Sequence, residues 1–251
     1  MNTFHFFKSI PVVAALLVSA NVSFGQMASQ SPAGADATLM KLFGDIKAFS
    51  AVCDMRMLDP DGSPTFSGPM DFALLDGKMC VEVDLLKMTA KDMPPGAAEA
   101  MKQAGMDRVI SIVRTDKKNQ AIIYPGLKSC VEMPLPKKQA DALDDKSSKI
   151  EKSELGKEKI DGRDCTKNKV VIKNDKGETQ EFTVWNAADL KDFPVQIETV
   201  QDGQKIVMLF KQVKLDKPAA AKFEIPADYK KYDDMGSFMQ AMMARMMSGG
   251  Q

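Results

Sequence analysis

Sulfur-containing side chains are the most prominent reactive groups of this chain of 251 residues, which has 19 methionines and four cysteines. Near the C-terminus, methionines and one phenylalanine recur with the spacing of a single helix face: Met235, Phe238, Met239, Met242, Met243, Met246 and Met247. Such a stripe can pack against an apolar sheet or lid, and it can also grip an apolar ligand, because methionine is flexible and polarisable. Thioethers also bind Cu(I), which leaves copper binding by this tail as a third alternative.

Histidine chemistry is excluded for residues 26–251, because the only histidine is His5. Ser-His-Asp and Cys-His catalysis, imidazole bases and histidine-ligated zinc all require this residue type. Glu82 and Asp84 share one face of a predicted strand and could pair as acid and base, but nothing in the sequence marks them as buried. No glycine-rich phosphate loop is present. We therefore predict that the protein is not an enzyme and holds neither a cofactor nor a metal centre.

Residues 1–25 have the layout of a secretory signal peptide. A single cation, Lys8, precedes the apolar run 10–18, and the small-residue sequence Ser23-Phe24-Gly25 follows. The apolar run is shorter than the roughly 20 residues that a membrane-spanning helix needs. We predict cleavage between Gly25 and Gln26, and export to the periplasm or beyond as a chain without a transmembrane segment.

Export makes disulfides possible for the four cysteines, Cys53, Cys80, Cys130 and Cys165. Four cysteines allow three pairings, and the sequence alone does not choose among them. Side-chain alternation along the predicted strands points Cys53 and Cys80 to opposite faces. We therefore predict a Cys130–Cys165 disulfide, with Cys53–Cys80 as the second candidate.

The net charge gives no indication of a nucleic-acid partner. The whole chain has 34 basic and 34 acidic residues, and the loss of Lys8 with the leader leaves 33 basic residues against 34 acidic ones. A charge this close to zero does not create the positive field that nucleic acids attract. Removal of 25 of the 251 residues leaves 226, which fits one large β domain.

Three apolar runs of strand length lie close together at the centre of the chain: Val109–Val113, Ala121–Tyr124 and Cys130–Met133. They predict the middle of an antiparallel meander, and the first run is apolar on both faces, which indicates cover on both sides. Further strands are predicted at Phe49–Leu58, Pro69–Leu75, Lys78–Leu86, Ile150–Ile160, Asp164–Lys173, Glu178–Asn186, Pro194–Gln201, Lys205–Leu215 and Phe223–Ile225. The turns Asp76-Gly77, Asp161-Gly162 and Asp202-Gly203 connect hairpins.

Helices are predicted at Asp36–Lys47, Met93–Gly105, Pro136–Ser148 and Met235–Met247. An open sheet of about ten strands usually curls, so the predicted fold class is α+β, with a curled antiparallel sheet and helices against its hollow face. Alternation along the strands predicts a set of interior-facing residues that forms either a dry core or a ligand cavity: Met55, Met57, Met70, Phe72, Leu74, Val81, Val83, Ile110 and Ile112.

Four groups of short motifs follow one another along residues 36–232. They are Leu39-Met40-Lys41-Leu42 with Phe49-Ser50-Ala51, Asp116 with Tyr124-Pro125-Gly126 and Lys128, Trp185–Leu190 with Phe193-Pro194-Val195, and Phe210–Lys214 with Phe223–Tyr229. This order resembles the LolA/LolB-like lipoprotein-carrier superfamily, in particular its secreted members that carry a domain of unknown function. In that superfamily, the four corresponding segments form the first helix and strand, the central hairpin, the segment before the penultimate hairpin and the closing strands.

The resemblance implies a half-open β-barrel (residues 36–232) with helices as a lid over an apolar cavity. A flexible linker (26–35) would precede it and the Met-rich tail (233–251) would follow. The family's lid-fastening arginine has no clear counterpart, since the nearest residue, Arg56, alternates with Asp54. The implied function is an exported binding protein for a hydrophobic ligand or an acylated partner. The alternatives are an envelope interaction module with a filled barrel and, third, Cu(I) binding by the tail.

Overall fold

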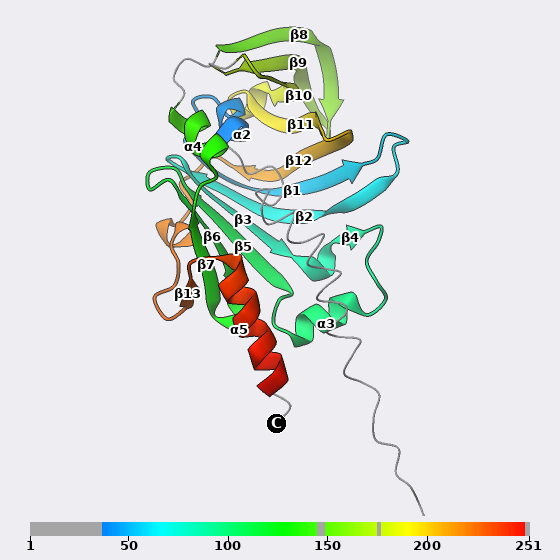
Figure 1. Ribbon diagram of the computed structural model, residues 1–251. Coiled ribbons are helices and arrows are strands. Elements are labelled where there is room, and N and C mark those ends of the chain that lie inside the picture. The colour runs from blue at the N-terminus through cyan, green and yellow to red at the C-terminus, as the bar shows by residue number, and fades with distance from the viewer. Residues whose placement is uncertain (1–36, 145–148, 175–176, 249–251) are drawn as a thin grey trace, which may run out of the picture.

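The computed structural model describes residues 37–144, 149–174 and 177–248, and one sheet of thirteen strands dominates them (Figure 1). The strand bounds are β1 (Ala48–Leu58), β2 (Pro64–Leu75), β3 (Lys78–Asp84), β4 (Thr89–Ala90), β5 (Arg108–Arg114), β6 (Asn119–Tyr124), β7 (Ser129–Pro134), β8 (Lys149–Ile160), β9 (Arg163–Lys173), β10 (Thr179–Ala187), β11 (Phe193–Gln201), β12 (Gln204–Lys214) and β13 (Lys230–Tyr232).

The strand order is β13-β7-β6-β5-β3-β2-β1-β12-β11-β10-β9-β8, with β4 beside β2. The sheet is therefore two meanders that meet where β1 pairs with β12. It curls without closing, because β13 and β8 end the order instead of pairing with each other. The predicted fold class, a curled and half-open antiparallel sheet with a few helices, is confirmed.

Two-residue turns set the register of three hairpins. Asp76-Gly77, Asp161-Gly162 and Asp202-Gly203 each have positive φ at both positions, close to +50° at the aspartate and +80° at the glycine. This conformation matches the right-handed twist of the flanking strands, and it favours the Asp-Gly sequence. The predicted turns are thus present where the sequence placed them.

The described residues also contain four α-helices and four short 3₁₀ helices: α2 (Ala37–Leu42), α3 (Ala97–Gln103), α4 (Lys137–Asp144), α5 (Met235–Ser248), η2 (Leu85–Lys87), η3 (Pro125–Leu127), η4 (Ala188–Leu190) and η5 (Ala220–Phe223). α2 and α4 contact each other, and α2 contributes Leu39 to the main core. α5 packs on strands β6 and β7 through a separate cluster around Phe238. The hollow face is thus covered by short helices from different parts of the chain.

The C-terminal region departs from the prediction in one place. Phe223–Ile225 was expected to form a strand, but Phe223 ends the 3₁₀ helix η5 and is almost completely buried against the outer face of the sheet. Pro226 follows closely and has no backbone N–H to donate to a neighbouring strand. The closing strand is instead β13, which pairs in parallel with β7.

Candidate functional site

The candidate site is the concave face of the sheet, and strand register decides which residues belong to it. Across β1 and β2, Cys53 pairs with Met70 and Ala51 pairs with Phe72. Across β2 and β3, Phe72 pairs with Val81. Directly paired residues point to the same face of a sheet.

Seven of the nine predicted interior residues share the concave face. Met55, Met70, Phe72, Leu74, Val81 and Val83 belong to its buried core, and Met57 packs at the edge of that core. The other two were placed on the wrong face. Ile110 and Ile112 point to the outer face, where they pack in a second cluster with Phe223. Both faces of β5 are apolar, so alternation alone could not tell which set faces inward.

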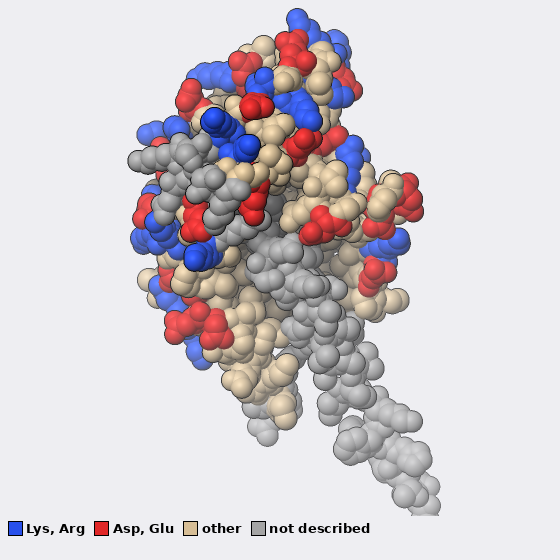
Figure 2. Space-filling model, turned by 45° about the horizontal axis from the view of Figure 1, so that its top comes forward, with Lys and Arg blue, Asp and Glu red and all other residues tan. Residues whose placement is uncertain are grey.

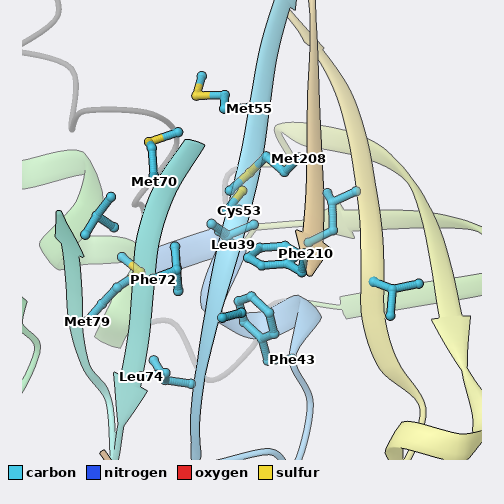
Figure 3. Packing of buried hydrophobic residues seen from close by; sticks show 14 of the residues in the cluster. Leu39, Phe43, Cys53, Met55, Met70, Phe72, Leu74, Met79, Met208 and Phe210 are labelled. Carbon is cyan, nitrogen blue, oxygen red and sulfur yellow. The ribbon is translucent and has the colours of Figure 1, made fainter. Parts of the chain in front are cut away.

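Five phenylalanines fill the middle of the concave face. Phe43, just after α2, lies 4.7 Å from Phe49 between ring centroids and also contacts Phe72, Phe193 and Phe210. Phe49 and Phe72 stack with their centroids 5.6 Å apart. Figure 3 shows Phe43, Phe72 and Phe210 gathered together, with the sulfur atoms of Met55, Met70 and Met208 farther along the face. Aromatic pairs of this kind contribute about 0.5–1.5 kcal/mol each beyond the area they bury.

The Met-rich tail forms α5, and its inner side covers the β5–β7 end of the concave face. Phe238 is completely buried between Tyr124, which it stacks on at 4.7 Å, and Tyr232, at 5.5 Å. Burial raises the pKa of Tyr124 to about 12. Met235, Met239 and Met242 pack in the same cluster, in agreement with a packing role.

The outer side of α5 is open to solvent. Met243 is 41% exposed and Met247 is 89% exposed, whereas the side chain of Met246 lies outside the described residues. The described methionines of the tail are therefore divided between the packed side and the exposed side of α5. Copper binding by the tail stays an untested prediction.

A side-chain cap fixes the start of α5. The Asp234 carboxylate accepts hydrogen bonds from the Ser237 backbone N–H at 2.8 Å and from the Ser237 hydroxyl at 2.7 Å. These bonds stabilise the charged carboxylate and lower the pKa of Asp234. The cap holds the helix at its first turn, which is the turn that carries Phe238 onto the sheet.

The disulfide predictions are wrong, because all four cysteines are buried free thiols. Cys130 packs in the outer cluster, whereas Cys165 and Cys53 belong to the concave core. Cys80 lies on the outer face and is therefore separated from Cys53 by the sheet itself. Burial strongly raises the pKa of Cys53 and raises that of Cys80 to about 11, so both thiols stay protonated near neutral pH.

The carboxylates with a possible acid-base role are engaged elsewhere. Glu82 forms an ion pair with Arg108. Asp84 pairs with Lys87 at 3.2 Å and accepts a hydrogen bond from the Leu86 N–H at 3.1 Å. Within the described residues, no group of three or more His, Cys, Asp and Glu side chains is placed to hold a metal ion.

Two buried polar groups were missed in the sequence. Arg114 is only 9% exposed; its guanidinium donates to both Asp116 oxygens, at 2.9 and 2.8 Å, and to Glu224 at 2.6 Å. On the concave side, the buried Asn168 amide donates to Asn186 at 3.0 Å, and Asn186 donates to the Asp192 carbonyl at 2.7 Å. One signal in the sequence could have indicated the Arg114 group: an arginine at the end of an apolar strand, two residues before an aspartate.

The predicted leader and linker, residues 1–35, with the Gly25–Gln26 cleavage site, lie outside the described residues. No helix among the described residues is both long enough and apolar enough to cross a bilayer. These segments remain predictions from the sequence.

The model of one protein family, a domain of unknown function (DUF4412), matches residues 49–193. No curated protein matches the sequence. The matched range begins in β1 and ends at the start of β11, so it contains most strands of the concave face.

Solved structures are similar at low sequence identity. PNGF-II is 11% identical over 79% of this chain, with a TM-score of 0.39; the match spans 33% of PNGF-II, about a third of its length. The lipoprotein LppX from Mycobacterium tuberculosis is 12% identical, and 87% of this chain and 100% of LppX are covered at a TM-score of 0.38. The LolA superfamily protein NE2245 from Nitrosomonas europaea is 10% identical, with 74% and 96% covered and a TM-score of 0.35. A LolA superfamily protein, the resemblance that the sequence predicts, is thus among the matched structures, but matches at these TM-scores do not say what this chain binds.

Proposed function

The chain belongs to the DUF4412 family, and we propose that it is an exported binding protein that shelters a hydrophobic ligand, or the acyl chain of a modified partner, on its concave face. The observation that carries this proposal is the extent of one apolar surface. The buried core runs without a break from Val170 on β9 to Val113 on β5. Among the described residues, short helices and loops cover it, and a second sheet does not.

The energetics favour such a ligand. Each methylene group buried on an apolar surface contributes about 0.8 kcal/mol, so a chain of ten carbons would gain enough to displace a weakly held cover. Methionines line much of the surface, at Met55, Met70 and Met208, and their flexible side chains adapt to ligands of different shape.

α5 is the cover best placed to move. It joins the sheet mainly through Phe238 and Met242, and its N-terminus follows directly on the three-residue strand β13. Release of α5 would uncover Ile122, Tyr124 and Val131, which continue the apolar concave face. Export of the protein rests on the signal-peptide layout of residues 1–25.

Native mass spectrometry of protein purified from an exporting host tests this proposal. We expect discrete added masses that organic extraction releases as lipid. Phe238→Ala should loosen α5 and increase uptake of added fatty acid, whereas Met247→Ala, at an exposed position of the same helix, should not. A wild-type protein without added mass, together with a Phe238→Ala variant that also refuses fatty acid, would contradict the proposal.

The five-phenylalanine cluster favours one alternative, an envelope interaction module with a filled barrel. Phe49 and Phe193 are completely buried, and Phe72 and Phe210 nearly so. A filled core should bind no apolar dye in the folded state. Dye binding that saturates at one site, and that fatty acid displaces, would exclude this alternative.

A further inference from the structure

A second pocket lies on the outer face of the sheet, beneath residues 216–229, here called the strap. Its volume is about 160 Å³. The floor is apolar and comes from neighbouring strands β2, β3, β5 and β6, and the roof is formed by Ala221, Pro226 and Tyr229 of the strap. The floor residues are Ala73, Cys80, Ile110, Ile112 and Ile123. This pocket is separated from the concave face by the whole thickness of the sheet.

The pocket stays open because its roof is fixed and its walls are small. Arg114 donates to the Phe223 carbonyl at 3.3 Å and to Glu224 at 2.6 Å, which holds one part of the strap. The Lys230 N–H donates to the Lys128 carbonyl at 2.9 Å just beyond the other end. Between these anchors, alanines at positions 73 and 221 leave space that larger side chains would fill. Small-molecule sites are usually preformed apolar pockets of about 300–1,000 Å³ with a few polar groups. This pocket has the same character but is smaller, so it admits only a small molecule.

Four charged residues surround the pocket, and two of them are already paired. Glu82 forms an ion pair with Arg108, and Glu224 pairs with Arg114 at 2.6 Å. The other two, Asp71 and Lys222, are exposed to solvent, and their side chains form no ion pair or hydrogen bond with any described residue. Both line the pocket together with Cys80.

We propose that this pocket binds a small zwitterion with an aliphatic body, the class to which free α-amino acids with apolar side chains belong. The ammonium group would pair with Asp71 and the carboxylate with Lys222, and the aliphatic group would lie on the isoleucines of the floor. An apolar cavity of about 150 Å³ accommodates a body of about six carbons. Two opposite, solvent-exposed charges in the lining match the two ends of such a ligand.

Titration of the exported chain with L-leucine tests the chemical class, with binding followed by NMR shifts of the floor methyl groups. Isoamylamine and 4-methylpentanoate serve as controls, because each keeps the aliphatic body and one of the two charges. We expect leucine to bind several-fold more tightly than either control, since an exposed charge pair contributes up to about a factor of five. Asp71→Asn and Lys222→Gln should each lower the leucine affinity by a similar factor. The proposal is overturned if leucine binds no better than both controls, or if neither substitution weakens it.

Two neighbouring alanines test the location. Ala221→Leu should fill the pocket and abolish leucine binding, whereas Ala220→Leu lies on the same turn, does not line the pocket and should leave binding unchanged. Leucine binding at wild-type strength in Ala221→Leu would place the ligand elsewhere and overturn the proposal. Lipid uptake on the concave face should be the same in both variants, so the two proposed sites can fail separately.

Discussion

The two meanders of the sheet differ in their outer faces: one is apolar and covered, and the other is charged and exposed. In the first, β1–β7, the outer face is apolar and lies beneath the strap, with Ile112 and Ile123 almost completely buried. In the second, β8–β12, the outer face carries ion pairs such as Lys169 with Glu181 and Lys205 with Glu198. Figure 2 shows charged side chains crowded over the β8 end of the molecule. The first meander is therefore buried on both faces and the second on one.

The two edges of the sheet follow the same division. β13 pairs with the edge strand β7, and α5 packs beside it. At the other edge, β9 is the one described strand that pairs with β8, and nearly all residues of β8 are exposed, most of them lysine or glutamate. Charged residues on an edge strand discourage pairing with other chains. One edge is thus protected by added structure and the other by charge.

The largest expected effect is on the outer face of the first meander. Ile112→Ala should lower the free energy of unfolding by about 2–5 kcal/mol, because Ile112 is 2% exposed and its removal leaves a cavity. Val200→Ala, on the outer face of the second meander, should change it by less than about 0.5 kcal/mol, because Val200 is 69% exposed. Urea denaturation measures both. Equal effects at the two positions would remove the distinction between the meanders.

Much of this difference could be predicted from the sequence. The Asp-Gly turns fixed three hairpins, and the apolar character of both sides of Val109–Val113 indicated that this strand is covered twice. The strap could not be predicted, because Phe223 and Ile225 look like strand residues until their burial against the outer face is known. Without the strap, Ile110 and Ile112 had no outer cluster to join. Because the strap was not predicted, the role of Arg114 was not predicted either: its partner Glu224 lies in the strap, 110 residues away.

The next largest effect concerns the attachment of the strap. Arg114→Met should lower the free energy of unfolding by about 1–3 kcal/mol, because it removes charge-assisted hydrogen bonds to Asp116, Glu224 and the Phe223 carbonyl. Hydrogen exchange should then speed up in the strap and not in β8–β12. Arg163→Met, which removes an exposed pair with Asp189, is the matched control and should have little effect. Uniformly faster exchange in both meanders would contradict a local role.

A smaller effect is expected at the covered edge. Asp234→Ala removes the cap of α5, so this helix should fray at its first turn and Phe238 should leave the sheet more often. Amide exchange in α5 and the fluorescence of the tyrosines beneath it would report the change. Asp233→Ala, at the adjacent exposed residue, serves as the control. If α5 stays equally protected in both variants, packing by Phe238 rather than the cap determines its position.

The smallest effect is a pH dependence at the attachment of the strap to the first meander. The hydrogen bonds from Arg114 lower the pKa of Asp116 from 3.8 to about 2. Because the folded state holds the carboxylate in its charged form, this contribution is complete above the unfolded pKa near 3.8 and is lost as the pH falls towards 2. Asp116 is 44% exposed, so solvent screening should keep the contribution below about 1 kcal/mol. Urea denaturation at pH 5, 3 and 2 should show a loss of stability in the wild type that is larger than the loss in Asp116→Asn. Equal losses in the two proteins would mean that Arg114 holds the strap through Glu224 and the Phe223 carbonyl alone.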